Sequence, residues 1–171
     1  GDIGPYWDMS AGNFITTTRR EVGSSYTLFY YWKPVNMDQK SLHKGYDDDY
    51  WVHVHSNTNL GFWAYRGGSA WCSTNYEITM DTWQTLIVTG VATDVDNGIG
   101  TSTYYVNGVQ AGSTIDRVAS GDSTEVIGAG NNPGHVAVAG VLNTALNTAD
   151  ITSLHNHMTS TKSSTGVCSA C

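Results

Sequence analysis

Aromatic and imidazole side chains alternate with aliphatic ones along two neighbouring stretches of the sequence. Trp51, His53 and His55 lie at every second position of residues 50–55, and Trp63 and Tyr65 do so in residues 60–65. Because successive side chains of a strand point to opposite faces, these five face outward if the aliphatic residues between them form the core. Their rings could stack on sugar faces while the imidazoles hydrogen-bond to hydroxyls. They could equally pack against loops or a second copy of the chain.

Acidic residues gather at two places that could bind calcium, a cation that prefers oxygen ligands. The first is the run Asp47, Asp48 and Asp49. The second is Asp94, Asp96 and Asn97. Neither follows the spacing of a known calcium loop, so a solvated acidic turn is the alternative at each. Calcium is the one cofactor that the sequence suggests, and we place it at the first run.

A catalytic pair of carboxylates is harder to find. The best match to the alternating carboxylates of glycan-cleaving enzymes is residues 77–81, where Glu77 and Asp81 flank a threonine at position 79. On one strand these two would lie roughly 13 Å apart, whereas glycosidase pairs are separated by about 5 to 9.5 Å. The histidines together with Tyr65 and Arg66 supply the residue types of polysaccharide lyases, but not a motif. We therefore expect no enzyme, with glycan cleavage as a lesser alternative.

The three cysteines are Cys72, Cys168 and Cys171. The last two form a Cys-x-x-Cys that follows a Ser/Thr-rich stretch rather than opening a helix after a strand, so a redox role is disfavoured. A zinc site would need further ligands. We expect one intrachain disulfide, with Cys72 to Cys168 as one pairing, and a third cysteine that is free or joined to another molecule.

The overall composition excludes several classes of function. The 171 residues contain 8 Lys and Arg against 15 Asp and Glu, and the basic residues form no patch, so nucleic acid is not an expected partner. No apolar run reaches the length of a membrane span, so we expect no membrane insertion. Only 13% of residues are charged, and Gly is abundant with 19 residues, as in globular β proteins.

Short segments of alternating hydrophobicity, separated by turn residues, indicate an all-β domain. We expect strands at residues 25–33, 50–55, 60–65, 71–78, 83–89, 101–106, 109–113, 123–127 and 135–142. Asn107-Gly108 between two of them is a strong hairpin signal. Both faces of residues 25–33 are largely apolar, as expected for a strand inside a sandwich.

One short helix is expected near the C-terminus. Leu146, Ile151, Leu154 and Met158 recur at helical spacing, and either Asn147 or Thr148 could cap the helix. We expect a single domain over residues 1–158, followed by an exposed Ser/Thr-rich tail over residues 159–171 that carries the Cys-x-x-Cys.

Four segments occur in an order that resembles the laminin-G-like and pentraxin-like branch of the concanavalin A-like superfamily. They are YTLFYYWKP at 26–34, WQTLIVTG at 83–90, YYVNG at 104–108, and GVLNTAL at 140–146 followed by the short helix. The resemblance covers about residues 26–158. It implies an antiparallel two-sheet jelly-roll sandwich, and many modules of this family bind calcium or glycans.

The expected function is binding or assembly rather than catalysis. We expect a secreted, extracellular structural or adhesion protein that packs against copies of itself through its aromatic sheet face. Sparse charge, aromatic residues and an odd cysteine all suit self-assembly. The alternative is a lectin-like module that binds extracellular glycans, with or without calcium. The extracellular setting rests on the cysteines, the Ser/Thr content and the resemblance.

Overall fold

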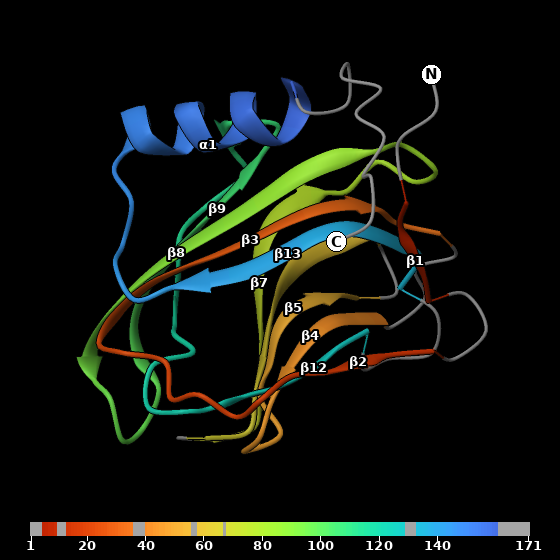
Figure 1. Cartoon of the computed structure of the whole chain (residues 1–171). Coiled ribbons are helices and arrows are strands. Elements are labelled where there is room, and N and C mark those ends of the chain that lie inside the picture. Colours follow the sequence, from red (N-terminus) through yellow and green to blue (C-terminus); the bar gives the residue numbers. More distant parts are fainter. Residues whose placement is uncertain are drawn as a thin grey trace.

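The computed structural model describes residues 5–9, 13–35, 40–55, 58–66, 68–128 and 133–160. Two antiparallel sheets pack face to face, and one helix follows them near the C-terminus (Figure 1). The predicted all-β, two-sheet sandwich with one short helix is thereby confirmed. In the described part of the chain, no helix has the length and apolar character needed to cross a membrane.

The seven-stranded sheet has the order β1-β13-β3-β8-β9-β10, and β11 also pairs with β9. Its strands are β1 (Trp7–Asp8), β13 (His135–Leu142), β3 (Ser25–Lys33), β8 (Gln84–Asp94), β9 (Ile99–Val106), β10 (Val109–Gln110) and β11 (Ile115–Arg117). The longest ladders join β13 to β3, β3 to β8 and β8 to β9. These strands carry, in whole or in part, all four segments on which the family resemblance rests.

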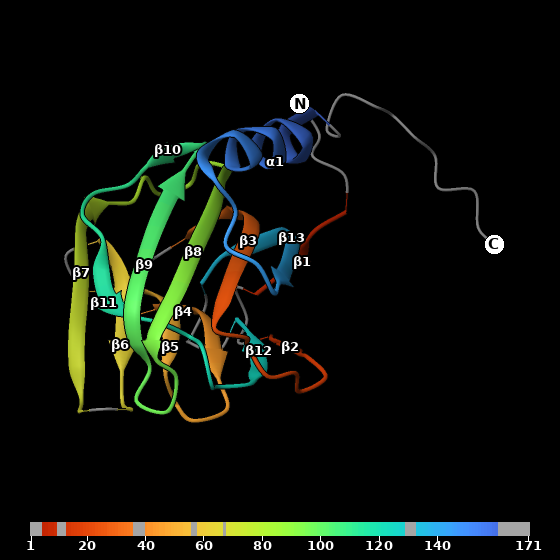
Figure 2. The ribbon, with the colours of Figure 1, turned by 90° about the vertical axis from the view of Figure 1, so that its left-hand side faces the viewer.

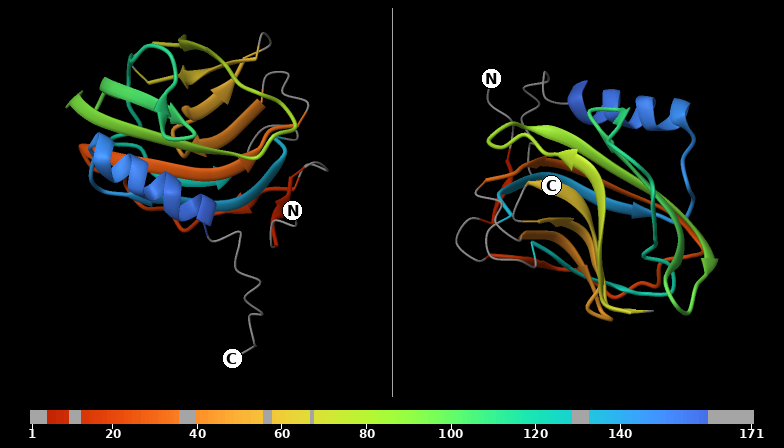
Figure 3. Two further views of the ribbon diagram at one scale, coloured as in Figure 1. Left: turned by 90° about the horizontal axis from the view of Figure 1, so that it is seen from above. Right: turned by 180° about the vertical axis from the view of Figure 1, so that it is seen from behind.

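The six-stranded sheet has the order β2-β12-β4-β5-β6-β7. Its strands are β2 (Ile15–Thr16), β12 (Thr124–Ile127), β4 (Lys40–Gly45), β5 (Tyr50–Val54), β6 (Asn59–Ala64) and β7 (Ala70–Glu77). Figure 3 shows that β4 to β7 curve strongly along their length. Strands β5 and β6 of this sheet carry the two alternating stretches, residues 50–55 and 60–65, that contain the predicted face residues.

Every strand predicted from the sequence occurs, although β8 extends to Asp94 and β10 ends at Gln110. The sequence analysis missed β1, β2, β4 and β11. Strand β4 lacks a clear apolar alternation because it contains several polar residues, of which Ser41 and His43 are buried. Each has a partner on another strand: Ser41 Oγ lies 2.7 Å from His53 Nδ1, and His43 Nδ1 bonds to the Tyr30 hydroxyl. Hydrogen bonding removes most of the cost of burying such groups.

The hairpin between β9 and β10 turns at Asn107-Gly108, as predicted. Both residues have positive φ angles, 52° and 78°, which a two-residue type I′ turn requires. The Asn107 side chain also accepts a hydrogen bond from the Thr85 N–H on β8. The turn is therefore tied to the centre of the seven-stranded sheet.

The core between the sheets contains several tyrosine and tryptophan side chains as well as aliphatic ones. Tyr26, Tyr30, Trp32 and Tyr104 are all fully buried. The Tyr104 hydroxyl donates to the Trp51 carbonyl at 2.6 Å, and the Trp32 indole N–H donates to a carbonyl at 2.7 Å. Large rings thus fill the core while their polar atoms are satisfied.

Helix α1 (Thr148–Ser160) packs on the outer face of the seven-stranded sheet, on the side away from β4 to β7 (Figures 1 and 2). Ile151 and Met158 are buried against that sheet. Asn147 is the N-cap, since its Oδ1 accepts from the N–H groups of Ala149 and Asp150. The helix runs two residues into the predicted tail, and residues 161–171 lie outside the described chain. One outer face of the sandwich is thereby covered.

Candidate binding face

Six ring side chains gather on the outer side of the six-stranded sheet. We call this set the aromatic face: Tyr50, His53, His55, Trp63, Tyr65 and Trp71. They come from β5, β6, β7 and the residues directly after β5 and β6. No helix of the described chain packs on this side of the sandwich (Figure 3). It is the largest group of contacting rings in the described part of the molecule.

Strand register explains why the rings meet. Trp63 pairs with Tyr50 across β5–β6 and with Trp71 across β6–β7, so the three lie side by side on one sheet face. His55 lies parallel to Trp63 at 6.2 Å and stacks on Trp71 at 5.2 Å between ring centroids. Each ring therefore fixes the orientation of its neighbours.

Gly61 gives the Trp71 indole its place. It faces the same side of β6 as Trp63, and a Cβ atom at this position would lie 2.7 Å from a carbon of the Trp71 ring. It would also lie 2.1 Å from the Cys72 carbonyl oxygen. A side chain at position 61 would therefore collide with the β7 backbone and with the Trp71 ring.

Trp51 does not lie on the outward face that was predicted for it. Its side chain is 0% exposed and lies in the core, where its indole N–H donates to Asp122 at 3.2 Å and its ring lies 4.6 Å from His43. A β-bulge between Tyr50 and His53 adds a residue to β5 and reverses the alternation before the bulge. Tyr50 therefore takes the outward position that regular alternation assigns to Trp51.

The other predicted face residues lie where the sequence placed them. His53, His55, Trp63 and Tyr65 all belong to the aromatic face, with Tyr65 the most exposed at 48%. Trp71 was missed as a face residue. Its pairing opposite Trp63 is the signal that could have found it, but that signal requires the register between β6 and β7.

Two polar rings of the aromatic face, His53 and Tyr50, are neutral at pH 7. Burial, with a smaller effect of His55, lowers the pKa of His53 to about 4, and this imidazole is only 7% exposed. Burial raises the pKa of the Tyr50 phenol, which therefore keeps its proton. The face offers ring surfaces together with neutral hydrogen-bonding groups, a combination suited to uncharged polar ligands.

The acidic run does not converge on one point. Asp49 is buried and holds Arg66 through its Oδ2 at 2.7 Å, while its Oδ1 accepts from the backbone N–H of Tyr65 and Arg66. Asp48 is exposed and pairs with Lys44 at 2.7 Å. Across the described chain, no three acidic, histidine or cysteine side chains are grouped closely enough to hold a metal ion. The calcium prediction gains no ligand set from the described residues.

Of the residue types considered for catalysis, His53, His55 and Tyr65 lie together on the aromatic face, but Arg66 and the two carboxylates do not join them in a site. Arg66 is fully engaged, since it pairs with Asp49 and donates to the carbonyl oxygens of Val118 and Ser120 at 3.2 and 2.9 Å. Glu77 ends β7, and Asp81 lies in the following turn, both with exposed side chains. Arg66 thus supports the loop rather than a lyase site.

Cys72 forms no disulfide within the described part of the chain. Its Sγ lies 3.8 Å from the Asp116 carboxylate, and burial and this acid raise the pKa of the thiol. Such a thiol is a weak nucleophile. Cys168 and Cys171 lie outside the described residues, so the predicted disulfide stays a prediction.

No protein-family model and no curated protein matches this sequence. Solved structures do match its fold. A native heptameric SAP-like pentraxin from Limulus polyphemus aligns over 83% of this chain and 74% of its own, with a TM-score of 0.58 and 17% identity. Domain 4 of AbnA, a GH43 extracellular arabinanase from Geobacillus stearothermophilus solved with arabinotriose, aligns over 91% of this chain and 78% of its own, with a TM-score of 0.62 and 18% identity.

A third match is the sialidase of Trypanosoma rangeli, with a TM-score of 0.56 and 15% identity. It covers 82% of this chain but only 24% of the sialidase, so this chain spans one part of that larger protein. At such identities the likeness defines the fold and nothing more. The chain has the two-sheet jelly-roll sandwich fold that its sequence motifs predict.

Proposed function

We propose that this chain is a non-catalytic carbohydrate-binding module whose aromatic face binds a neutral glycan. The observation that carries the proposal is the set of stacked rings on the side of the sandwich opposite the helix. Sugar rings present apolar C–H faces and hydroxyl edges, which match indole surfaces and hydrogen-bonding imidazoles. That one protein of this fold was solved with arabinotriose supports the choice of ligand class.

The test is a glycan array with and without calcium, followed by titration of the best oligosaccharide. We expect Trp71→Ala and Trp63→Ala each to weaken binding by about tenfold, since a lost ring contact is worth on the order of 1 kcal/mol. Trp7→Ala is the matched control, because Trp7 is an exposed tryptophan of the other sheet. No hit on the array, or equal losses in all three variants, would remove the proposal.

The array tests whether binding needs calcium, and a reducing-sugar assay on the bound glycan tests whether the chain cleaves it. Binding that needs calcium would restore the acidic run as a ligand site. Release of reducing sugar from the bound glycan would make the chain an enzyme, against our proposal. The extracellular setting is part of the same proposal, because polymeric glycans are encountered chiefly outside the cell.

Self-assembly is the second candidate. A separate group of exposed aromatic side chains favours it: Tyr6, Trp7 and Phe14 are 50, 52 and 61% exposed near the N-terminal strands. The pentraxin of this fold is heptameric, which supports this candidate. Exposed apolar groups of this size are often covered by a partner copy.

A further inference from the structure

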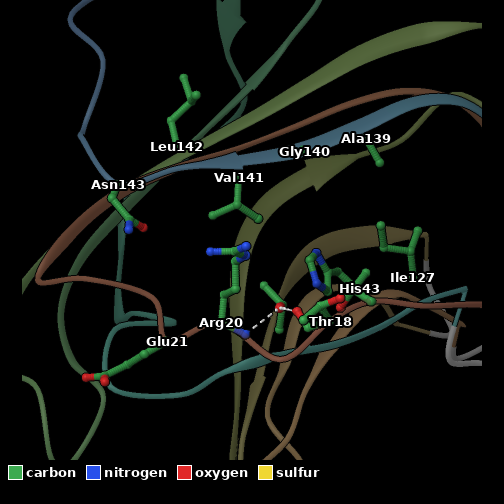
Figure 4. A pocket seen from close by; sticks show the side chains of 12 residues that line it. Thr18, Arg20, Glu21, His43, Ile127, Ala139, Gly140, Val141, Leu142 and Asn143 are labelled. Carbon is green, nitrogen blue, oxygen red and sulfur yellow. Dashed lines mark hydrogen bonds between the residues drawn. The ribbon is translucent and has the colours of Figure 1, made fainter.

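A cavity of about 500 Å³ lies between the two sheets, away from the aromatic face. Its walls come from β13 on one side and from β12, β4 and the segment after β2 on the other (Figure 4). This volume lies within the range of small-molecule sites, about 300 to 1,000 Å³. None of the six residues of the aromatic face lines it.

The side walls of the cavity are apolar. Ala139 and Val141 of β13 face the interior and pack against the main core, and Ile127 of β12 lies across from them (Figure 4). The hydroxyl of Thr124 is already engaged, since it donates to the Thr18 carbonyl. The walls therefore suit the apolar body of a ligand.

The two ends of the cavity are polar. At the outer end, Arg20 is exposed and extends toward Val141, and in the described chain its guanidinium contacts no carboxylate (Figure 4). Glu21, the one acid of the lining, points away from Arg20. A guanidinium beside an apolar cavity can form charge-assisted hydrogen bonds with the carboxylate of a ligand.

The inner end carries a buried polar atom without a partner. His43 lines the cavity and is 1% exposed, and its Nε2 makes no hydrogen bond among the described residues. Its Nδ1 bonds to the buried Tyr30 hydroxyl. When the Tyr30 hydroxyl donates to Nδ1, the neutral imidazole carries its proton on Nε2, and when it accepts, Nε2 is the unprotonated atom.

We propose that this cavity between the sheets is a binding site for a small monocarboxylate with an apolar body, of the kind of a medium-chain fatty acid. The carboxylate binds the Arg20 guanidinium, and the chain lies between β12 and β13. Arg20, rather than His43, is assigned to the carboxylate because its side chain is exposed and charged. This site is separate from the proposed glycan face.

Octanoate and octanol are the probes, titrated into the whole chain by calorimetry and by protein-observed NMR. We expect octanoate to bind at one site and tighter than octanol. Arg20→Gln should weaken octanoate about tenfold, the worth of a charge-assisted hydrogen bond, and leave octanol unchanged. Arg19→Gln is the matched control, since Arg19 pairs with Glu125 and does not line the cavity.

A second variant tests the location. Ala139→Leu fills the space between the sheets and should abolish binding of both probes, with folding checked by the dispersion of the NMR spectrum. Trp71→Ala should leave octanoate binding intact, which separates this site from the glycan face. Equal affinity for octanoate and octanol, equal effects of Arg19→Gln and Arg20→Gln, unchanged binding in Ala139→Leu, or no binding at all would each overturn the proposal.

Discussion

The carboxylates of the acidic run differ in how much stability each supplies. Asp49 is buried beside Arg66, whereas Asp48 pairs with Lys44 at the surface. Removing one partner of a buried ion pair leaves the other charge without compensation and costs about 3 to 5 kcal/mol, while an exposed pair is worth about 0 to 1 kcal/mol. Urea denaturation at pH 7 should therefore show a large loss for Asp49→Asn and a small one for Asp48→Asn. Similar losses would mean that the Asp49–Arg66 pair does not hold the loop.

The buried histidines make stability depend on pH. Burial lowers the pKa of His43 to about 3 and that of His53 to about 4, against 6.5 for an ordinary histidine. Below pH 6.5 these two histidines therefore bind protons in the unfolded chain but stay unprotonated in the folded chain. The stability that these neutral side chains contribute is complete above pH 6.5 and is lost as the pH falls toward 4 and then 3.

The expected slope is about 1.4 kcal/mol per pH unit for each histidine. Chemical denaturation at several values between pH 7.5 and 5 measures it. His53→Gln keeps a hydrogen-bonding group beside Ser41 but cannot titrate, so its stability should fall less steeply with acid than that of the wild type. An unchanged slope would show that His53 titrates normally in the folded chain.

Helix α1 owes its start to one side chain. Asn147 accepts hydrogen bonds from two backbone N–H groups of the first turn. Asn147→Ala should lower the free energy of unfolding by about 1 kcal/mol, as for other N-caps. Asn156→Ala, an exposed position in the same helix, should cause no loss because alanine favours helix. Thermal unfolding of the two variants makes the comparison, and a loss in Asn156→Ala as large as in Asn147→Ala would argue against the cap.

Sequence patterns predicted most of the strands and missed others. Alternation and turn residues predicted β3, β5 to β9 and β13, because apolar residues alternate along much of each strand and the turns between them contain Gly, Pro, Asn or Asp. Strand β4 escaped, because its buried polar residues find partners that only the folded sheet supplies. Trp51 was misplaced because a single bulge reverses the alternation of β5, and the position of a bulge depends on the pairing of two strands.

The candidate sites divide in the same way. Four of the five predicted face residues lie on the aromatic face, because each is set by local alternation. Trp71 completes that face through its register with Trp63, which a single strand does not reveal. The cavity was not predicted at all. Its lining joins Arg20, His43 and Val141, residues brought together only when the two sheets pack.

The whole sandwich has two outer faces, and they differ in what covers them. Helix α1 covers one, through a cluster that includes Tyr31, Ile87 and Ile151. The other carries the aromatic face, most of whose rings are partly buried against one another. This arrangement removes much of the apolar surface that a stable interface needs, roughly 800 Å² per partner. The net charge of −7 further opposes association of identical chains.

We therefore expect a monomer of 18.5 kDa in size-exclusion chromatography with light scattering, at micromolar concentration and with reductant present. Omitting the reductant separates disulfide-linked species from non-covalent ones, since the chain has an odd number of cysteines. Two variants locate any association that does occur. If Trp71→Ser converts an oligomer to monomer, the aromatic face assembles copies of the chain and the glycan proposal loses its surface. If Trp7→Ser does so instead, the exposed N-terminal aromatics form the interface, and the aromatic face stays available for a glycan.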